Sequence, residues 1–185
     1  MQDEVIAEAR QEMEAALTAF RHELARVRTG RASTALLEGL QVSYYGAKAP
    51  LRQVAGLTAP DPKLLVITPY DKSAIHEIEK AILASDLGLN PINDGKIIRV
   101  PIPDLNEERR RELVRRVRKL AEEFRVSVRN HRRDANEMLR ELHKEKQITQ
   151  DELRLGEGKI QRFATEYIEK LDQVLAAKEA EIMEV

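Results

Sequence analysis

Apolar residues recur at steps of three and four along the first 28 residues of the chain. The positions are Ile6, Ala9, Met13, Ala16, Phe20, Leu24 and Val27. This spacing is typical of a helix that turns one face toward a protein core. It predicts an N-terminal helix with a single buried stripe.

The same period returns over residues 106–146. Asn106 is a candidate N-cap, and Glu107 and Glu108 place acids in the first helical turn. The expected buried stripe is Leu113, Val117, Leu120, Phe124, Val128, Ala135, Met138 and Leu142. His131 falls on the same side, so we expect it to be packed against protein or hydrogen-bonded.

A third helix is predicted to begin after Thr149, because Thr149 and Glu152 have the spacing of a capping box. Its expected stripe is Leu153, Ile160, Phe163, Tyr167, Leu171, Val174 and Ile182. The short stretch around Gln147 and Ile148 makes the second and third helices antiparallel. Three helices with one apolar stripe each bury these stripes best in a bundle.

The segment between the first two helices has a different composition. All seven prolines lie between Pro50 and Pro103, and six of the eight glycines lie between Gly30 and Gly95. Both residue types interrupt helices. Strand-like runs occur at residues 40–45, 64–68 and 97–100, with a short helical pattern within residues 72–85.

These patterns together predict an α+β chain. We expect an elongated three-helix bundle of residues 1–29 and 106–185, with a small β/α/β domain of residues 30–105 inserted between helices 1 and 2. Two short crossings join the parts, and their glycine and proline favour a hinge at about 29–31 and 103–106. The hinge residues are Thr29, Gly30, Arg31, Pro103, Asp104 and Leu105.

The net charge of −1 conceals a strongly basic second helix. Residues 106–146 contain nine acidic and fourteen basic residues, and eleven of the bases are arginine. On a wheel of about 100° per residue, eight of these arginines fall within roughly 60° of Arg111. They are Arg111, Arg115, Arg118, Arg125, Arg129, Arg132, Arg133 and Arg140. We call them the arginine row.

Two interpretations of the arginine row stand side by side. Glu122, Glu137 and Glu141 have the spacing to pair with it, which would make it an ordinary solvated face. The excess of positive charge and the choice of arginine over lysine favour phosphate binding, because the guanidinium fork fits a phosphate group. With only 4% aromatic residues, a base-stacking platform is disfavoured, and folded RNA fits the row better.

Catalytic patterns are missing from the sequence. It has no phosphate-binding glycine motif and no cysteine, and its four histidines lack zinc-type spacing. We therefore expect no enzyme activity, no metal and no cofactor. No apolar run reaches the length of a membrane span, and no leader is evident, so a cytoplasmic protein is expected. A monomer is expected because the bundle satisfies every stripe.

Several separated motifs resemble ribosome recycling factor of bacterial type. They are Arg28–Ala32, Tyr44–Gly46, Ser85–Pro91, Glu107–Arg110 and Val128–Ala135. The resemblance runs from the first helix to the C-terminus, with a mild departure at His131. It implies an L-shaped, tRNA-like protein that binds the post-termination ribosome across the A and P sites of the large subunit. Acting with elongation factor G and GTP, such a factor splits the subunits and frees mRNA and deacylated tRNA.

The resemblance also implies which residues meet ribosomal RNA. Arg110, Arg129 and Arg132 match family positions linked to such contact, although Arg110 lies nearer the apolar flank of the wheel. The remaining expected contacts are Arg118, Arg125 and Arg133 of the row, and Arg28 and Arg31 beside the hinge. Two rival interpretations are a coiled-coil adaptor for an acidic protein surface and a hydrolase hidden in the inserted domain. Co-sedimentation with ribosomes separates the adaptor from the recycling factor.

Overall fold

The computed structural model describes residues 1–184 as two compact units of the chain. One unit joins Met1–Leu24 to the chain from Arg111 onward, and the other is Ala25–Arg110. Residues distant in the sequence therefore form the first unit, and the second is inserted between them. The expected α+β class is confirmed.

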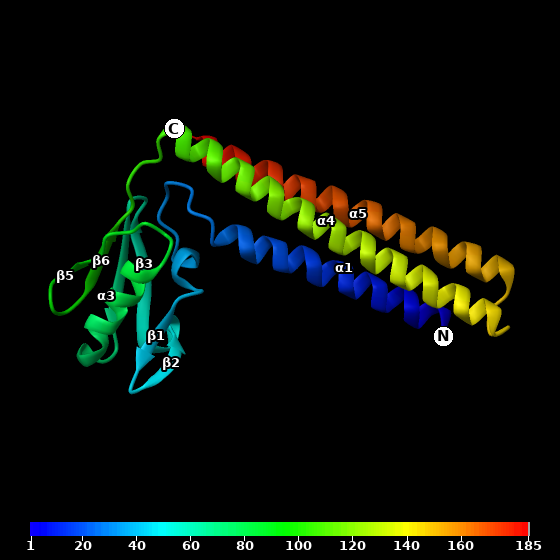
Figure 1. Ribbon diagram of the computed structural model, residues 1–185, viewed down its shortest axis with the longest axis horizontal. Helices are drawn as coiled ribbons and strands as arrows, with labels where there is room; N and C mark the ends of the chain where they lie inside the picture. Colours follow the sequence, from blue (N-terminus) through cyan, green and yellow to red (C-terminus); the bar gives the residue numbers. More distant parts are fainter. Residues whose placement is uncertain (185) are drawn as a thin grey trace. The chain divides into compact units, whose positions relative to one another are not determined.

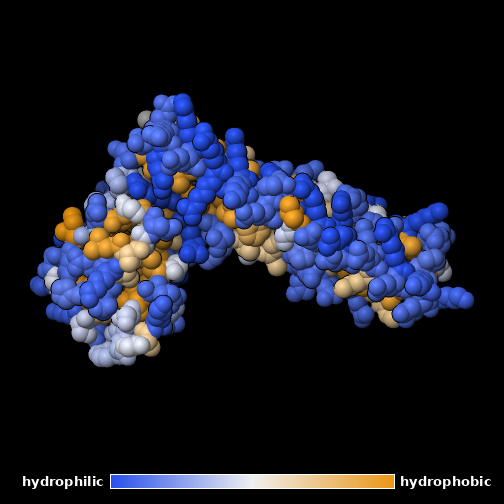
Figure 2. Space-filling model, viewed as in Figure 1, coloured by the Kyte–Doolittle hydropathy of each residue, from blue (hydrophilic) through white to orange (hydrophobic). Residues whose placement is uncertain are grey.

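The first unit is a bundle of three long helices that run side by side (Figure 1). They are α1 (Gln2–Ala25), α4 (Glu107–Lys144) and α5 (Gln150–Met183). Helix α1 ends before Val27, so the predicted N-terminal stripe extends too far at its last position. Helices α4 and α5 are antiparallel, as predicted. The visible face of the bundle is mostly hydrophilic (Figure 2), which fits helices that turn their apolar stripes inward.

Local signals set the turn between α4 and α5. Lys146 has φ 59°. Its amide donates to the carbonyl of His143, and the Gln147 amide donates to the carbonyl of Leu142, which together form a Schellman motif. The capping box predicted at Thr149 and Glu152 is present at the start of α5.

The buried stripe of α4 differs from the prediction on one side. Met138 was expected inside but is 47% exposed, whereas Leu139 is fully buried. Ala121 is buried as well. Ala121 and Leu139 lie about 60° further round the wheel than the expected centre of the stripe, at 100° per residue. The buried face is therefore rotated toward the flank that carries Arg125 and Arg132.

Close contact between α4 and α5 explains one of the two glycines in α5. A Cβ atom built on Gly156 would lie 2.8 Å from Leu139 Cδ1, inside the core. A Cβ atom on Gly158 would meet nothing within 4 Å. Only Gly156 is thus required for packing.

The second unit contains two antiparallel sheets. The small sheet pairs β1 (Gln41–Tyr44) with β2 (Ala47–Pro50). The larger sheet has the order β3-β4-β6-β5. Its strands are β3 (Ala55–Asp61), β4 (Leu64–Pro69), β5 (Ile92–Asn93) and β6 (Ile98–Pro101). The three predicted strands correspond to β1, β4 and β6; the other three strands were not predicted.

One helix of the second unit covers its core, and short helices connect the strands. Helix α3 (Ile75–Ala84) buries Ile75, Ile78 and Ile82, as its apolar spacing predicted. Leu83, on the same helix, is exposed. The short helices are η1 (Thr34–Leu37), α2 (Leu51–Val54) and η2 (Lys72–Ala74). Within residues 1–184, no helix has the length and apolar character needed to cross a membrane.

Candidate nucleic-acid interface

Part of the arginine row lies against acidic side chains of α5. Arg118 forms two hydrogen bonds with Glu179, with Nε–Oε1 at 2.7 Å and Nη2–Oε2 at 3.1 Å. Arg125 Nη2 donates to Asp172 Oδ1 at 2.6 Å, and Arg140 Nε donates to Glu157 Oε1 at 2.9 Å. From one pair to the next, the arginine moves toward the C-terminus of α4 by as many residues as its partner moves toward the N-terminus of α5. These pairs follow the antiparallel contact of the two helices.

The carboxylates of these pairs neutralise the arginines that they meet. Hydrogen bonding to Arg118 lowers the pKa of Glu179, so this carboxylate stays ionised at neutral pH. Arg125 is only 22% exposed, because the rotated buried face draws it toward α5. Arg118, Arg125 and Arg140 therefore each contact a carboxylate of α5.

Glu122 pairs with the arginine row within α4, as the solvated-face interpretation expected. Glu122 accepts from Arg125 Nη1 at 3.0 Å and from Arg129 Nη1 at 2.9 Å. These hydrogen bonds lower the pKa of the Glu122 carboxyl. In the part of the chain that the structure describes, Glu137 and Glu141 form no such pair with the row. Arg129 uses one of its five N–H donors on Glu122, and its side chain is 46% exposed.

Arg132 differs from the paired arginines because its partner is neutral. Its Nη1 donates to Gln161 Oε1 at 3.0 Å. Gln161 is itself held, since its Nε2 donates to Thr165 Oγ1 at 3.2 Å. The guanidinium of Arg132 is thus oriented without losing its charge. Arg133, one residue on, donates from Nε and Nη2 to Asp134.

Three exposed cations near the start of α4 were not among the expected contacts. Arg115, Arg116 and Lys119 form no ion pair within the described residues 1–184. Arg115 belongs to the row, whereas Arg116 and Lys119 lie between the row and the apolar stripe. The sequence reasoning missed these cations because the sequence of α4 alone does not show which of its charges α5 neutralises.

A second group of arginines lies within the Ala25–Arg110 unit. Arg28 Nη2 donates to the carbonyl of Pro103 at 2.9 Å. The Nε atoms of Arg28 and Arg110 are buried without a hydrogen-bond partner among the described residues. Burial and the charge of Arg109 lower the pKa of Arg28. A buried donor without an acceptor costs about 1–3 kcal/mol. Arg31 is exposed on the same connector.

The two connectors are attached to the turn between β3 and β4. Lys63 Nζ donates to the carbonyl of Gly30 at 2.8 Å and forms an ion pair with Asp104. The Lys63 carbonyl accepts from the Ile102 amide at 2.8 Å, and the neighbouring turn carbonyl accepts from the Ala32 amide at 2.7 Å. The ammonium lowers the pKa of Asp104. One lysine therefore joins both connectors to the same turn.

The remaining hinge residues take part in this packing. Thr29 is buried and Gly30 has φ 80°, a conformation that favours glycine. A Cβ on Gly30 would lie 3.7 Å from Leu105 Cγ, so the two connectors approach each other here. Of the six expected hinge residues, Gly30, Pro103 and Asp104 contact Lys63 or Arg28 directly.

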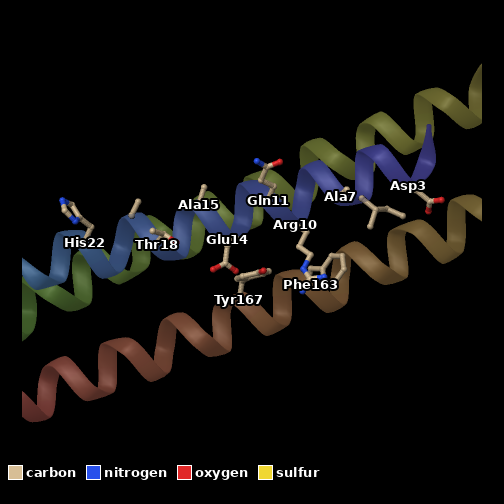
Figure 3. Close-up of a pocket in the computed structure, with 12 residues that line it drawn as sticks. Asp3, Ala7, Arg10, Gln11, Glu14, Ala15, Thr18, His22, Phe163 and Tyr167 are labelled. Carbon is tan, nitrogen blue, oxygen red and sulfur yellow. The ribbon is translucent and has the colours of Figure 1, made fainter.

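A groove of about 1050 Å³ lies between α1 and α5. Arg10 and Glu14 reach from α1 toward Phe163 and Tyr167 of α5 (Figure 3). The guanidinium of Arg10 lies 5.1 Å from the centre of the Phe163 ring. Burial and a hydrogen bond to Glu14 raise the pKa of Tyr167. Arg10 and Glu14 are thus engaged in contacts between α1 and α5.

His131 is half-buried and hydrogen-bonded, as expected. Its Nδ1 lies 3.0 Å from Glu12 Oε2 on α1, and its Nε2 lies 3.3 Å from Ser127 Oγ. The order of groups resembles a catalytic triad, but Ser127 lies inside a helix. Backbone amides there are committed to helical hydrogen bonds, so they provide no oxyanion site. Within residues 1–184, no group of histidine and acidic side chains has the arrangement to hold a metal.

Known proteins resemble this chain over almost its whole length. A family model for ribosome recycling factor matches residues 20–183. The ribosome-recycling factor of Natranaerobius thermophilus is 53% identical over 180 residues, which cover 97% of this chain and 98% of the relative.

Solved structures agree with this match. A solution structure of a ribosome recycling factor has a TM-score of 0.78 and 43% identity, over 100% of this chain and 98% of that one. A second structure holds the T. thermophilus ribosome recycling factor and E. coli elongation factor G bound to the E. coli post-termination complex. Its factor matches with a TM-score of 0.68 and 49% identity, over 100% of both chains. The chain therefore belongs to the ribosome recycling factor family.

Proposed function

We propose that the chain recycles ribosomes after termination. It binds the post-termination ribosome and, with elongation factor G and GTP, separates the subunits, so that mRNA and deacylated tRNA are released. The T. thermophilus factor bound to a post-termination complex with elongation factor G, 49% identical over the full length, carries this proposal. GTP binding belongs to the partner, which accords with a chain that has no phosphate-binding loop. The place of action is the cytoplasm, where bacterial ribosomes lie.

The proposed contacts with ribosomal RNA fall into two groups of arginines. On α4 we assign them to Arg129, Arg132 and Arg133, with Arg132 at the centre because its charge is oriented and not neutralised. Beside the connectors we assign them to Arg28, Arg31 and Arg110, where two buried Nε donors have no acceptor among the described residues. A phosphate would contact the other guanidinium N–H groups of these arginines, because the Nε atoms themselves are buried.

Two arginines from the expected set receive a different role in this proposal. Arg118 and Arg125 form ion pairs with α5, and we assign them to fixing the position of the arginine row. Removing either charge then affects RNA binding indirectly, through the register of α4 and α5.

The proposed hinge is narrower than the sequence indicated. Gly30, Pro103 and Asp104 are bonded to side chains of the Ala25–Arg110 unit. Bending then falls on the residues between these attachments and the bundle helices, at 26–29 and 105–106. Replacing Lys63 with Met removes the link between the connectors. We expect a broader distribution of distances between dyes placed on the two units, measured by single-molecule energy transfer.

Ribosome binding and subunit splitting test the function directly. Co-sedimentation of the full chain with post-termination ribosomes measures binding, and light scattering after addition of elongation factor G and GTP measures splitting. We expect binding without elongation factor G and splitting only when it is present. A chain that splits no subunits and does not co-sediment would favour the adaptor interpretation. Ester hydrolysis by the isolated chain would favour the hydrolase interpretation.

A further inference from the structure

The turn between β1 and β2 places a tyrosine where the backbone takes a left-handed conformation. Tyr45 and Gly46 form a two-residue turn, with Tyr44 paired to Ala47 across the hairpin. Tyr45 has φ 48°, and Gly46 has φ 80°. The left-handed region costs about 1–2 kcal/mol for most residues, and asparagine or glycine is preferred at this turn position. Tyr45 is also 81% exposed, so burial offsets little of that cost.

Hydrogen bonds hold this exposed ring in one place. Tyr45 Oη donates to Asp71 Oδ2 at 3.1 Å, and Tyr44 Oη donates to the same oxygen at 3.3 Å. The two rings meet edge to face, with centroids 4.5 Å apart. Asp71 is fixed in turn, because its Oδ1 accepts from the Ser73 amide at 2.9 Å. We call Tyr44, Tyr45 and Asp71 the tyrosine–carboxylate cluster.

Stability alone does not account for this cluster. The bond to Ser73 already gives Asp71 a structural role as the cap of η2. Tying the hairpin to Asp71 needs only one phenol, and the half-buried Tyr44 provides it. Tyr45 adds an exposed aromatic ring at an unfavourable φ, which is the kind of local cost found at binding sites. Tyr70, which precedes Asp71 in the chain, is also exposed, at 73%.

The chemistry of the cluster selects a positively charged partner group. Hydrogen bonds from Ser73 and Tyr45 lower the pKa of Asp71, so its carboxylate is ionised. Aromatic faces attract cations, and a carboxylate beside them adds to the attraction. The same carboxylate repels phosphate, which disfavours a nucleic-acid backbone at this place.

We propose that the tyrosine–carboxylate cluster is a docking site for a lysine or arginine side chain of a protein partner. This contact lies outside the arginine groups assigned to RNA and adds a protein-binding surface to the Ala25–Arg110 unit. The cation stacks on Tyr45 and pairs with Asp71. The strained turn presents the ring in advance, so less ordering is required when the partner binds.

Fluorine NMR tests the proposal on the full chain without ribosomes. Labelling with 3-fluorotyrosine gives four resonances, from Tyr44, Tyr45, Tyr70 and Tyr167. The probe is a blocked hexapeptide of alternating arginine and glycine. We expect saturable shifts of the Tyr45 and Tyr44 resonances, with half-saturation at roughly millimolar peptide, as for one isolated contact. Tyr167, buried between α1 and α5, is the internal control and should not shift.

Two variants and two control ligands distinguish specific binding of a cation from other causes of a shift. Asp71→Asn keeps the size of the side chain and removes its charge, so half-saturation should move about tenfold higher. Tyr45→Asn relieves the turn, so its melting temperature should be equal or higher while the shift of Tyr44 is lost. The corresponding glutamate–glycine peptide and a short RNA should leave the cluster unshifted.

The opposite results overturn the proposal. Absence of a shift with the arginine peptide, or unchanged titration of Tyr44 in Tyr45→Asn, would leave the cluster a purely structural tie. Shifts caused by RNA in place of the peptide would make it a nucleic-acid contact. None of these outcomes bears on ribosome co-sedimentation, so failure here is distinct from failure of the proposed function.

Discussion

Two sets of arginines on α4 share one helix and differ in what they face. Arg118, Arg125 and Arg140 meet carboxylates of α5, whereas Arg132 meets the neutral amide of Gln161. Residue type and helix position are similar in both sets. The difference comes from the neighbouring helix. A count of charges along one helix therefore overstates the charge that is available to a ligand.

The largest expected effect is a difference in ribosome binding between variants of Arg132 and Arg140. Both changes, Arg132→Gln and Arg140→Gln, remove one positive charge from the same face of α4. Arg132→Gln should weaken ribosome binding by roughly tenfold or more, because a charged hydrogen bond contributes about 1.5–3 kcal/mol. Arg140→Gln should change binding by less than about threefold, because Glu157 already neutralises it. Co-sedimentation measures both, with circular dichroism as the control for folding, and equal losses would erase the distinction between the sets.

The second prediction tests whether the lengthwise alignment of α4 and α5, which determines the arginines that α5 neutralises, is fixed by packing. Gly156→Ala places a methyl group against Leu139, and this overpacking exceeds the gain in helix propensity, so the free energy of unfolding should fall by about 1 kcal/mol. Gly158→Ala meets no neighbour and should raise it by about 0.5–1 kcal/mol through helix propensity. Urea unfolding of the two variants measures these changes. A stabilising Gly156→Ala would mean that the helices shift easily and that their ion pairs do not depend on one lengthwise position.

Salt dependence sharpens the comparison further. The logarithm of ribosome affinity should fall linearly with the logarithm of salt concentration, with a slope of about 0.7–0.9 for each phosphate contacted. Arg132→Gln should reduce this slope by roughly one contact, and Arg118→Gln should leave it unchanged. Titrations between low and moderate salt give the slopes. A flat response in the unaltered chain would rule out phosphate anchoring altogether.

The smallest expected effect concerns acid stability. Arg118 lowers the pKa of Glu179 in the folded chain. A lowered carboxyl pKa contributes stability above the unfolded value of about 4.3, and this stability is lost as pH falls through the folded value. Arg118→Ala removes the depression, so the acid unfolding midpoint should move slightly to higher pH. Arg132→Ala, whose partner has no charge, should leave the midpoint unchanged when followed by circular dichroism.

Much of the fold follows from apolar spacing and caps. The three long helices, the capping box at Thr149 and Glu152, and strands β1, β4 and β6 were predicted. The missed strands, β2, β3 and β5, all lie at sheet edges. Edge strands tolerate proline and have only one paired side, so β3, which contains Pro60, lacks the alternating pattern of a central strand.

The candidate site was less accessible to the same reasoning. The arginine row and the basic character of α4 are visible in the sequence. The assignment of each arginine to α5 or to solvent is not, because it depends on which residue of one helix lies beside which residue of the other. The exposed Met138 has the same origin: the wheel places apolar residues on one side, but packing with α1 and α5 selects the buried face.

The close approach of Gly156 to Leu139 affects which RNA α4 can bind. With α5 held at one lengthwise position, the guanidinium groups keep fixed intervals along the helix, at about 1.5 Å per residue. Only RNA whose phosphates have the same spacing as these guanidinium groups can then contact several of them at once. Deleting one residue between Arg129 and Arg132 would rotate Arg132 and Arg133 by about 100° relative to Arg129 and would spoil the match.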